Sequence, residues 1–248
     1  MNDQLIKKLK LLKQSKHRKV KNQFVAEGKR LVGEAINYGS TVDSLFCTQT
    51  FYNKNVNSWQ GFLRVDNSMI KVITDSQFKS ISSTSTPSGI AALCSIPRSP
   101  YINFKVRKWI YLDKIRDPGN LGTILRSALW FGFKNIILSS ESVDPYNPKA
   151  IRSGMGSHFR LNLYQNLRLN DFIKTHLIVS GSTLGEDISG FKLPERYVLV
   201  LGNEAHGISK NIEPLIQKSV SIKRLGEGES LNLSSAASIL MYSLTRKR

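Results

Sequence analysis

The chain has few cysteines, few acidic residues and no long hydrophobic run, and each shortage excludes a class of protein. Only Cys47 and Cys94 occur among 248 residues, so neither a disulfide framework nor a zinc site can be built from cysteine alone. No apolar stretch approaches the roughly 18 residues that a membrane-spanning helix requires. Because the N-terminus leads into a lysine-rich helix and not into a signal-peptide core, we expect a cytoplasmic protein with buried thiols.

Several familiar ligand-binding motifs are also missing. The sequence contains no Gly-x-Gly-x-x-Gly, so neither a dinucleotide fold nor a Rossmann-type methyltransferase is supported. A Walker lysine motif and a Gly-x-Ser-x-Gly nucleophile elbow are absent as well. The four histidines are scattered without the spacing of metal ligands, so we expect no metal site.

The shortage of acidic residues leaves a large positive charge. Lysine and arginine number 36 against 18 aspartates and glutamates, which gives a formal net charge of +18. A field of this sign attracts polyanions, so RNA, DNA and anionic membranes are the candidate partners. No lipidation motif supports the membrane, and the clustering of the basic residues favours nucleic acid.

Helices and strands alternate along the first 95 or so residues. The expected elements are an amphipathic helix within 4–21, strands at 23–26, 42–47, 69–73 and 90–96, and helices at about 29–38 and 75–82. They suffice for a small α/β domain. Pro97 and Pro100 mark the best domain boundary, because two prolines in four residues disfavour both helix and strand pairing.

The rest of the chain continues the alternation. The expected strands are 108–112, 135–138, 177–180, 197–201 and 220–222, and the expected helices are about 121–131, 149–155 and 234–245. This order predicts an α/β domain with a mostly parallel sheet covered by helices on both faces. Ligands bind such sheets at the carboxyl ends of the strands, so the polar segments that follow the strands are the candidate site.

Three polar segments stand out in that position, and each also has a structural explanation. Asn120 begins a helix that carries Arg126 among apolar residues, where an arginine either binds an anion, reaches solvent or bridges to an acid. Glu204 follows a strand in Gly-Asn-Glu, which is also typical of a capped helix N-terminus. Ser230 and Asn232 precede the last helix, and they have no structural duty if Ser234 caps that helix.

Together these segments resemble the SpoU (TrmH-like) family of RNA 2′-O-ribose methyltransferases in the SPOUT superfamily. Residues 117–122 with Arg126 look like the family's first motif, residues 201–207 like its second, and residues 219–222 with 230–232 like its third. The segment from Phe24 to Val32 is similar to the family's L30-like RNA-binding domain. The resemblance implies an L30-like domain at 1–97, a linker at 98–106 and a methyltransferase domain at 107–248 with a C-terminal trefoil knot.

The resemblance also implies a cofactor, a dimer and an active site. S-adenosyl-L-methionine would lie in the knot against Leu201, Gly202, Ile222 and Leu231, and the family is typically a homodimer packed through the knotted domain. The catalytic residues implied are Arg126, Asn120, Glu204, Ser230 and Asn232. Arg126 would act either as the base or as a binder of phosphate and alkoxide charge, and the second role fits a guanidinium, which is rarely deprotonated in proteins.

RNA is the implied substrate, and the L30-like segment favours ribosomal over transfer RNA. The expected phosphate contacts are Lys16, Arg18, Lys19, Lys21, Lys29 and Arg30. In the family's middle motif, Ser153, Gly154 and Ser157 would either touch RNA or pack a helix tightly. The alternatives are a transfer-RNA ribose methyltransferase, a base methyltransferase of the same superfamily, and a knotted RNA-binding module without turnover.

Overall fold

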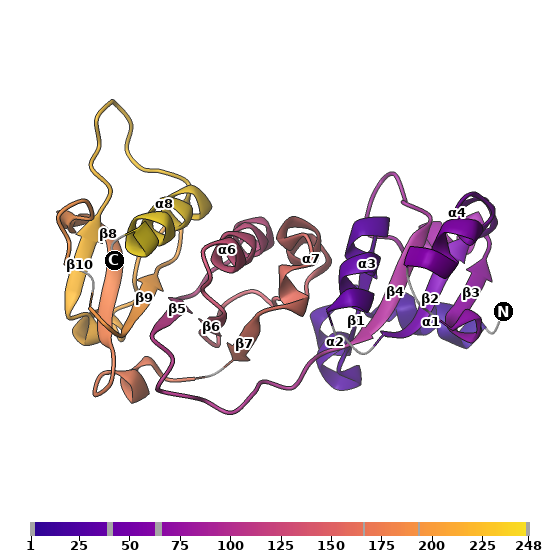
Figure 1. The fold of residues 1–248 in the computed structure, drawn as a ribbon, viewed down its shortest axis with the longest axis horizontal. Helices are drawn as coiled ribbons and strands as arrows, with labels where there is room; N and C mark the ends of the chain where they lie inside the picture. Colours follow the sequence, from indigo (N-terminus) through magenta and orange to yellow (C-terminus); the bar gives the residue numbers. More distant parts are fainter. Residues whose placement is uncertain (1–2, 39–41, 63–65, 166, 193, 247–248) are drawn as a thin grey trace. The chain divides into compact units, whose positions relative to one another are not determined.

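The computed structural model describes residues 3–38, 42–62, 66–165, 167–192 and 194–246. The chain forms two compact units, which are best followed by colour in Figure 1. Unit 1 comprises Met1–Arg98 together with Asp144–Phe159, and unit 2 comprises Ser99–Val143 and Arg160–Arg248. A short segment from the middle of the sequence thus belongs to the same unit as the N-terminus.

Unit 1 is built on a four-stranded sheet in the order β1-β4-β2-β3. Strands β1 (Gln23–Glu27) and β2 (Val42–Thr48) pair antiparallel with β4 (Ile90–Ser95), while β2 pairs in parallel with β3 (Ile70–Ile73). The helices of unit 1 are α1 (Asp3–Leu11), α2 (Ser15–Lys21), α3 (Lys29–Asn37), α4 (Gln49–Phe62), α5 (Asp75–Ile81) and α7 (Pro148–Gly154), with 3-10 helices η1 (Asn67–Met69) and η2 (Ser157–Phe159).

Two layers cover the sheet of unit 1. Ile6 and Leu9 of α1 and Phe78 of α5 pack with Phe46 and Leu93 on one face. On β1, Val25 joins that core, and because alternate side chains of a strand point to opposite faces, Phe24 points the other way. There the Phe24 ring lies 4.9 Å from that of Tyr146 and 6.0 Å from that of Phe159, so the 144–159 segment packs on β1.

The helix expected within residues 4–21 is two helices. The chain turns between Leu11 and Ser15, and the Arg18 guanidinium donates to the carbonyls of Leu12 and Lys13 in that turn, at 2.8 Å each. Helix α4 and strand β7 were not predicted from the sequence. The other expected elements are present, with ends shifted by a few residues and with β8 extending well beyond its expected end.

Unit 2 contains a six-stranded sheet in the order β10-β8-β9-β5-β6-β7. All five strand pairs are parallel, which confirms the expected α/β class. The strands are β5 (Lys108–Leu112), β6 (Asn135–Leu138), β7 (Asn162–Gln165), β8 (Leu177–Asp187), β9 (Tyr197–Leu201) and β10 (Lys218–Ser221). Strand β9 is buried along its whole length and β5 is buried from Trp109 to Leu112, as in sheets that are covered on both faces.

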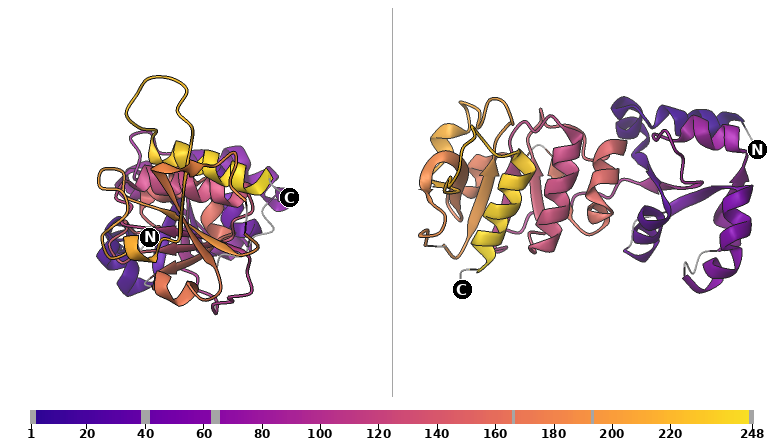
Figure 2. Two further views of the ribbon diagram at one scale, coloured as in Figure 1. Left: turned by 90° about the vertical axis from the view of Figure 1, so that its left-hand side faces the viewer. Right: turned by 90° about the horizontal axis from the view of Figure 1, so that it is seen from above.

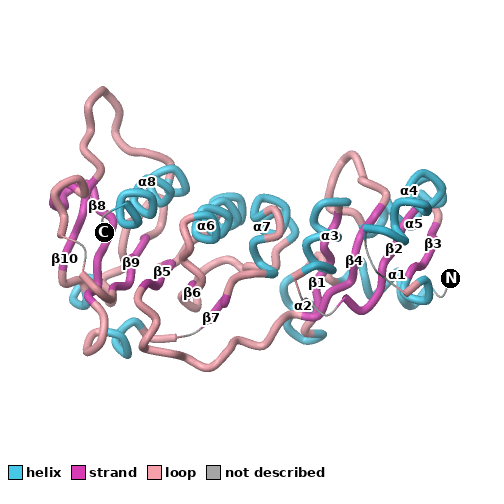
Figure 3. The backbone as a smooth tube through the Cα atoms, viewed as in Figure 1, coloured by secondary structure: helices cyan, strands magenta, loops and turns pink. Residues whose placement is uncertain are grey.

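The two faces of this sheet are covered differently. Helices α6 (Pro118–Trp130) and α8 (Leu233–Arg246) pack against each other on one face, as Figures 1 and 3 show. The other face carries Trp109, Tyr111 and Val198, which pack with the 3-10 helices η3 (Leu169–Phe172) and η4 (Glu213–Leu215). The second layer is therefore made of short 3-10 helices and irregular chain. Within the described ranges no helix is both long and apolar enough to cross a membrane.

Candidate active site

The carboxyl ends of β5 and β9 bring two of the polar segments together. Leu112 pairs with Leu201 at the ends of these parallel strands, and the Asp113 amide donates to the Leu201 carbonyl at 2.8 Å. The segments that follow, 113–120 and 202–209, therefore leave the sheet at the same edge. This is the edge where open α/β sheets bind ligands.

Two side chains hold these segments against each other. The Asp113 carboxylate is 1% exposed and accepts hydrogen bonds from the Ser209 amide at 2.8 Å and the Ser209 hydroxyl at 2.7 Å. The Asn203 side-chain amide donates to the Lys114 carbonyl at 2.8 Å. The 202–209 segment is thus fixed near both of its ends. Asp113 and Ser209 were not predicted as site residues, although Asp113 is a polar residue directly after an apolar strand, which is a usable signal.

The segment after β9 is a tight turn. Asn203 forms a bridge with Gly207, and the Asn203 side-chain oxygen accepts from the amides of Ala205 and His206 at 2.9 and 3.1 Å. A Cβ on Gly202 would lie 2.4 Å from the Gly207 carbonyl carbon, so only glycine fits there. The alternative of a helix N-terminus at Gly-Asn-Glu is therefore wrong, since the described chain forms a turn at this point.

Three of the predicted catalytic residues form one chain of hydrogen bonds. The Asn120 side chain donates to Glu204 Oε1 at 3.0 Å and accepts from Asn232 Nδ2 at 3.1 Å. Asp117 caps α6 and fixes the Asn120 backbone through a 2.7 Å bond to its amide. Residues from the ends of β9, the start of α6 and the start of α8 thereby meet at one place.

Asn232 also caps the last helix. Its side-chain oxygen accepts from the amides of Ser234 and Ser235 at 2.9 and 3.4 Å, and from the Ser234 hydroxyl at 2.6 Å. The expectation that Ser234 caps this helix is therefore wrong. Asn232 satisfies the free amides of the first helical turn while its amide group reaches Asn120, so one side chain fixes both the helix and the site.

Arg126 and Ser230 are placed differently from those three. Arg126 lies on α6, and its side chain is exposed, so the apolar surroundings suggested by its sequence neighbours are on other faces of the helix. Among the residues that the structure describes, its guanidinium has no hydrogen bond or ion pair, which leaves it available for an anion. Ser230 lies at the end of the exposed 223–230 segment, which projects from the sheet in Figures 1 and 2.

A cavity of about 830 Å³ in unit 2 is lined by the four predicted cofactor-binding residues, Leu201, Gly202, Ile222 and Leu231. Ser230 lines it too, so the cavity lies directly beside the Asn120–Glu204–Asn232 chain. Its volume is that of a small-molecule site, and its walls combine leucines with Ser182, Thr183 and Ser221.

The cavity fits S-adenosylmethionine in chemical terms. Apolar walls suit the adenine ring, while hydroxyls and backbone groups suit the ribose and the amino acid end. At Gly181, a Cβ would lie 2.6 Å from Leu240 Cδ1, so glycine keeps this wall closely packed. The described part of the chain has no group of three or more histidine, cysteine, aspartate or glutamate side chains that could hold a metal ion.

Five of the six predicted RNA contacts are exposed, and one is buried. Lys16, Lys19, Lys21, Lys29 and Arg30 are exposed on α2 and at the start of α3. Arg18 is 1% exposed, and its guanidinium forms an ion pair of 2.6 Å with Asp144. We therefore correct the prediction for Arg18, because a buried and fully paired guanidinium is not available to a phosphate.

The middle motif packs tightly. Gly154 and Ser157 are buried, and a Cβ on Gly154 would lie 2.5 Å from His158 Cε1. Burial lowers the pKa of His158 to about 4, despite the contact of its Nε2 with the Pro145 carbonyl at 2.8 Å. Of the two alternatives left open for Gly154 and Ser157, the packing role is the one that the structure supports.

Comparison with known proteins gives matches along nearly the whole chain. The SpoU rRNA Methylase family matches residues 107–242, and the MRM3-like substrate binding domain matches residues 3–92. The chain is 30% identical to the 23S rRNA (guanosine(2553)-2′-O)-methyltransferase RlmP of Bacillus subtilis, over 98% of this chain and 96% of that protein.

Two further proteins extend this likeness. The 23S rRNA (uridine(2479)-2′-O)-methyltransferase of Streptomyces viridochromogenes is 26% identical, over 91% of this chain and 83% of that protein. An rRNA methyltransferase from Sinorhizobium meliloti, solved with bound AdoMet (S-adenosylmethionine), superposes with a TM-score of 0.82 at 26% identity. That match covers 98% of this chain and 94% of the solved one.

Proposed function

The chain belongs to the SpoU rRNA Methylase family, as its motifs predicted, and from that premise we propose that it methylates a ribose 2′-hydroxyl of ribosomal RNA. The observation that carries this proposal is the hydrogen-bonded chain of Glu204, Asn120 and Asn232 at the edge of the 830 Å³ cavity. The methyl donor is S-adenosylmethionine, whose sulfonium supplies an electrophilic methyl group when it is bound.

The cavity residues would hold the cofactor mainly through backbone and apolar contact. Leu201 ends β9 and Gly202 follows it, Ile222 follows β10, and Leu231 precedes α8, so three separate segments of the chain enclose the site. Gly202 and Gly181 keep the wall of the cavity closely packed, because a Cβ there would meet the Gly207 backbone or the Leu240 side chain.

Arg126 would act on the RNA side of the reaction. Guanidinium groups stay protonated in proteins at neutral pH. Its exposure and its lack of an acidic partner within the described residues support a role in binding the phosphate next to the target ribose. The same positive charge would stabilise the alkoxide that develops as the 2′-hydroxyl loses its proton. Asn120, Glu204, Ser230 and Asn232 would orient these groups.

Ribosomal RNA is favoured as the substrate by two matches. The N-terminal residues match an MRM3-like substrate binding domain, and the relatives from Bacillus subtilis and Streptomyces viridochromogenes are 23S rRNA methyltransferases. One of those relatives acts on a guanosine and the other on a uridine, so family membership leaves the base open. A transfer-RNA ribose methyltransferase and an inactive RNA-binding module are the alternatives that the experiment below must separate.

Three further features belong to the proposal. The first is a trefoil knot at the C-terminal end of the methyltransferase domain, and the second is a homodimer packed through that domain. Trp130 on α6 and Ile239 and Tyr242 on α8 support the dimer, because they are 85%, 38% and 46% exposed and offer an apolar surface. The third is a cytoplasmic location, where an rRNA substrate would be met.

The domain boundaries proposed are 1–97 for substrate binding, 98–106 for the linker and 107–248 for methyl transfer. The compact units of the structure differ from these boundaries in one segment, because residues 144–159 belong to unit 1.

Transfer of labelled methyl from S-adenosylmethionine to unmodified rRNA and tRNA, followed by digestion to nucleosides, tests the proposed function. We expect a 2′-O-methylnucleoside from the rRNA, and its identity names the base. A ribose-methylated product from tRNA alone would replace the substrate, and a base-methylated product would refute the ribose chemistry. Absence of both transfer and cofactor binding would support the RNA-binding module.

A further inference from the structure

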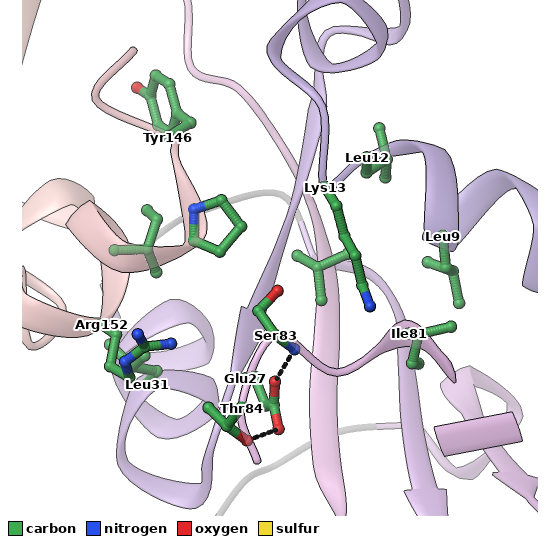
Figure 4. A pocket seen from close by; sticks show the side chains of 13 residues that line it. Leu9, Leu12, Lys13, Glu27, Leu31, Ile81, Ser83, Thr84, Tyr146 and Arg152 are labelled. Carbon is green, nitrogen blue, oxygen red and sulfur yellow. Dashed lines mark hydrogen bonds between the residues drawn. The ribbon is translucent and has the colours of Figure 1, made fainter. Parts of the chain in front are cut away.

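A hollow in the surface of unit 1 lies at the carboxyl end of β1, between α7 and the loop before β4. Figure 4 shows its polar side chains, Lys13, Glu27, Ser83, Thr84 and Arg152, and the leucines and Ile81 that line it with them. Its volume is about 30 Å³, the space of about one water molecule. A feature of this size does not enclose a small molecule, so its polar rim is the part that could bind a partner.

One carboxylate gives the loop on this rim its shape. Glu27 accepts from the hydroxyls of Ser82 and Thr84 at 2.7 and 3.2 Å and from the amides of Ser83 and Ser88 at 3.1 and 3.5 Å, two of these bonds being drawn in Figure 4. These donors occupy the carboxylate, so it is a structural part of the loop. The loop is in turn a fixed row of hydroxyl groups, with Ser83, Ser85, Thr86 and Ser88 exposed.

Positive charge surrounds this row of hydroxyls. Lys29 and Arg30 lie between Glu27 and Leu31, two residues that line the hollow, and both are exposed. Arg152 lies beside Leu31 in Figure 4 and is exposed, and no hydrogen bond or ion pair of its guanidinium occurs among the described residues. Unit 1 as a whole carries seventeen lysines and arginines against seven aspartates and glutamates.

The 144–159 segment that carries Arg152 is held firmly to unit 1. Asp144 forms the buried ion pair with Arg18 and accepts a 3.0 Å hydrogen bond from the Ser15 hydroxyl. Two residues later, Tyr146 packs against Phe24 of β1. Arg152 is thus presented by a fixed helix on the same unit as Lys29 and Arg30, although its segment lies within the 107–242 match to the methylase family.

We propose that Arg152, Lys13 and the Ser82–Ser88 loop form an RNA-backbone subsite of unit 1. Cations at both rims would contact successive phosphates, and the hydroxyl row between them would bind phosphate and ribose oxygens. RNA is the occupant that fits, because the charge is spread along a surface and this hollow, as the described residues form it, is too small to enclose an anion. The identity of the RNA rests on the proposed function, whereas backbone binding by this surface does not.

The test compares Arg152→Ala with Arg168→Ala. Arg168 is an exposed arginine of unit 2, 84% exposed and 3.7 Å from Asp171, so both variants remove one surface guanidinium. The probe is a fluorescent transcript of unmodified large-subunit rRNA, titrated without cofactor at several salt concentrations. We expect Arg152→Ala to weaken binding about 5- to 10-fold and to reduce the salt slope by about 0.7–1, as loss of one phosphate contact does, with Arg168→Ala unchanged.

Equal affinity and equal salt slopes in the two variants would overturn the proposal. Arg152→Lys adds a second measurement, because it keeps the charge and should keep most of the salt slope. Thermal unfolding of each variant excludes a folding defect, which is not expected for exposed side chains. If wild-type protein transferred no methyl group but Arg152→Ala still weakened RNA binding, the proposed function would fail while this subsite would stand.

Discussion

The buried ion pair between Arg18 and Asp144 makes a sharp prediction about the variant Arg18→Met. The side chains of the pair are 2% and 10% exposed, and the guanidinium also serves the carbonyls of Leu12 and Lys13. Removing it leaves a carboxylate and two carbonyls in a poorly solvated place. Breaking a buried pair in this way costs about 3–5 kcal/mol, so we expect the free energy of unfolding of unit 1 to fall by about that amount.

The assay is urea unfolding, monitored by far-ultraviolet circular dichroism. Lys19→Ala is the matched control. Lys19 is on the same helix and is exposed, so its variant should change stability by less than about 0.5 kcal/mol. RNA affinity should respond in the opposite order, weakened in Lys19→Ala and unchanged in folded Arg18→Met. The double variant Arg18→Met/Asp144→Leu removes the stranded charge but not the two stranded carbonyls. It should therefore recover part of the loss and remain about 1–3 kcal/mol less stable than wild type.

A loss of less than about 1 kcal/mol in Arg18→Met, together with weaker RNA binding, would refute this reasoning. It would return Arg18 to the set of phosphate contacts from which its burial removes it.

Four other predictions address the site and the pH dependence. Arg126→Ala should lower kcat by about 100-fold or more without weakening cofactor binding. Arg126→Lys should not restore turnover, because lysine cannot make the bidentate contact with phosphate. Single-turnover methylation measures the rate, and calorimetry measures cofactor binding. Asn232→Ala should cost about 1 kcal/mol through loss of the cap, whereas Asn232→Asp should keep the cap and the stability but, lacking a donor to Asn120, lose turnover. Gly202→Ala should abolish cofactor binding in a titration, because its Cβ would meet the Gly207 carbonyl carbon at 2.4 Å, while Gly190→Ala, whose Cβ meets only an oxygen at 3.8 Å, should bind normally. Burial lowers the pKa of His158 from 6.5 to about 4, so as the pH falls the unfolded chain binds the proton before the folded one does, and the free energy of unfolding should fall by about 3 kcal/mol between pH 6.5 and 4. The urea midpoint should depend less on pH over this range in His158→Gln than in wild type. An equal pH dependence in the two proteins would contradict the assignment.

Much of the fold follows from local patterns. Apolar runs such as 197–201, bounded by turn residues, predicted the central strands because a strand covered on both faces has no polar position to spare. Strand β7 was missed because its four residues include two polar ones, Asn162 and Gln165. Helix α4 was missed because its asparagines and single glycine give a weak helical signal.

The site was predictable only as far as its motifs. Asn120, Glu204 and Asn232 were predicted from the ordered motifs. Their hydrogen bonds depend on the sheet, because Asn120 lies in the first turn of α6, Glu204 follows β9 and Asn232 caps α8. The choice between Asn232 and Ser234 as the helix cap depends on where the first helical turn begins, and both residue types cap well. Arg18 was misassigned for a different reason. In a run of cations, only the fold decides which one turns inward, and its partner Asp144 is 126 residues away.

The chain passes between the two units three times, at residues 98–99, 143–144 and 159–160. The portion that folds with the N-terminus is therefore discontinuous in the gene. A protein fragment that begins at Ser99 would still contain Tyr146 and Phe159 but would lack Phe24, so two aromatic rings would lose the partner against which they pack. Recombination that exchanges substrate-binding regions between relatives would have to move two stretches of sequence together. Residues 144–159 would be expected to share their evolutionary history with residues 1–98 more closely than with the stretches on either side of them.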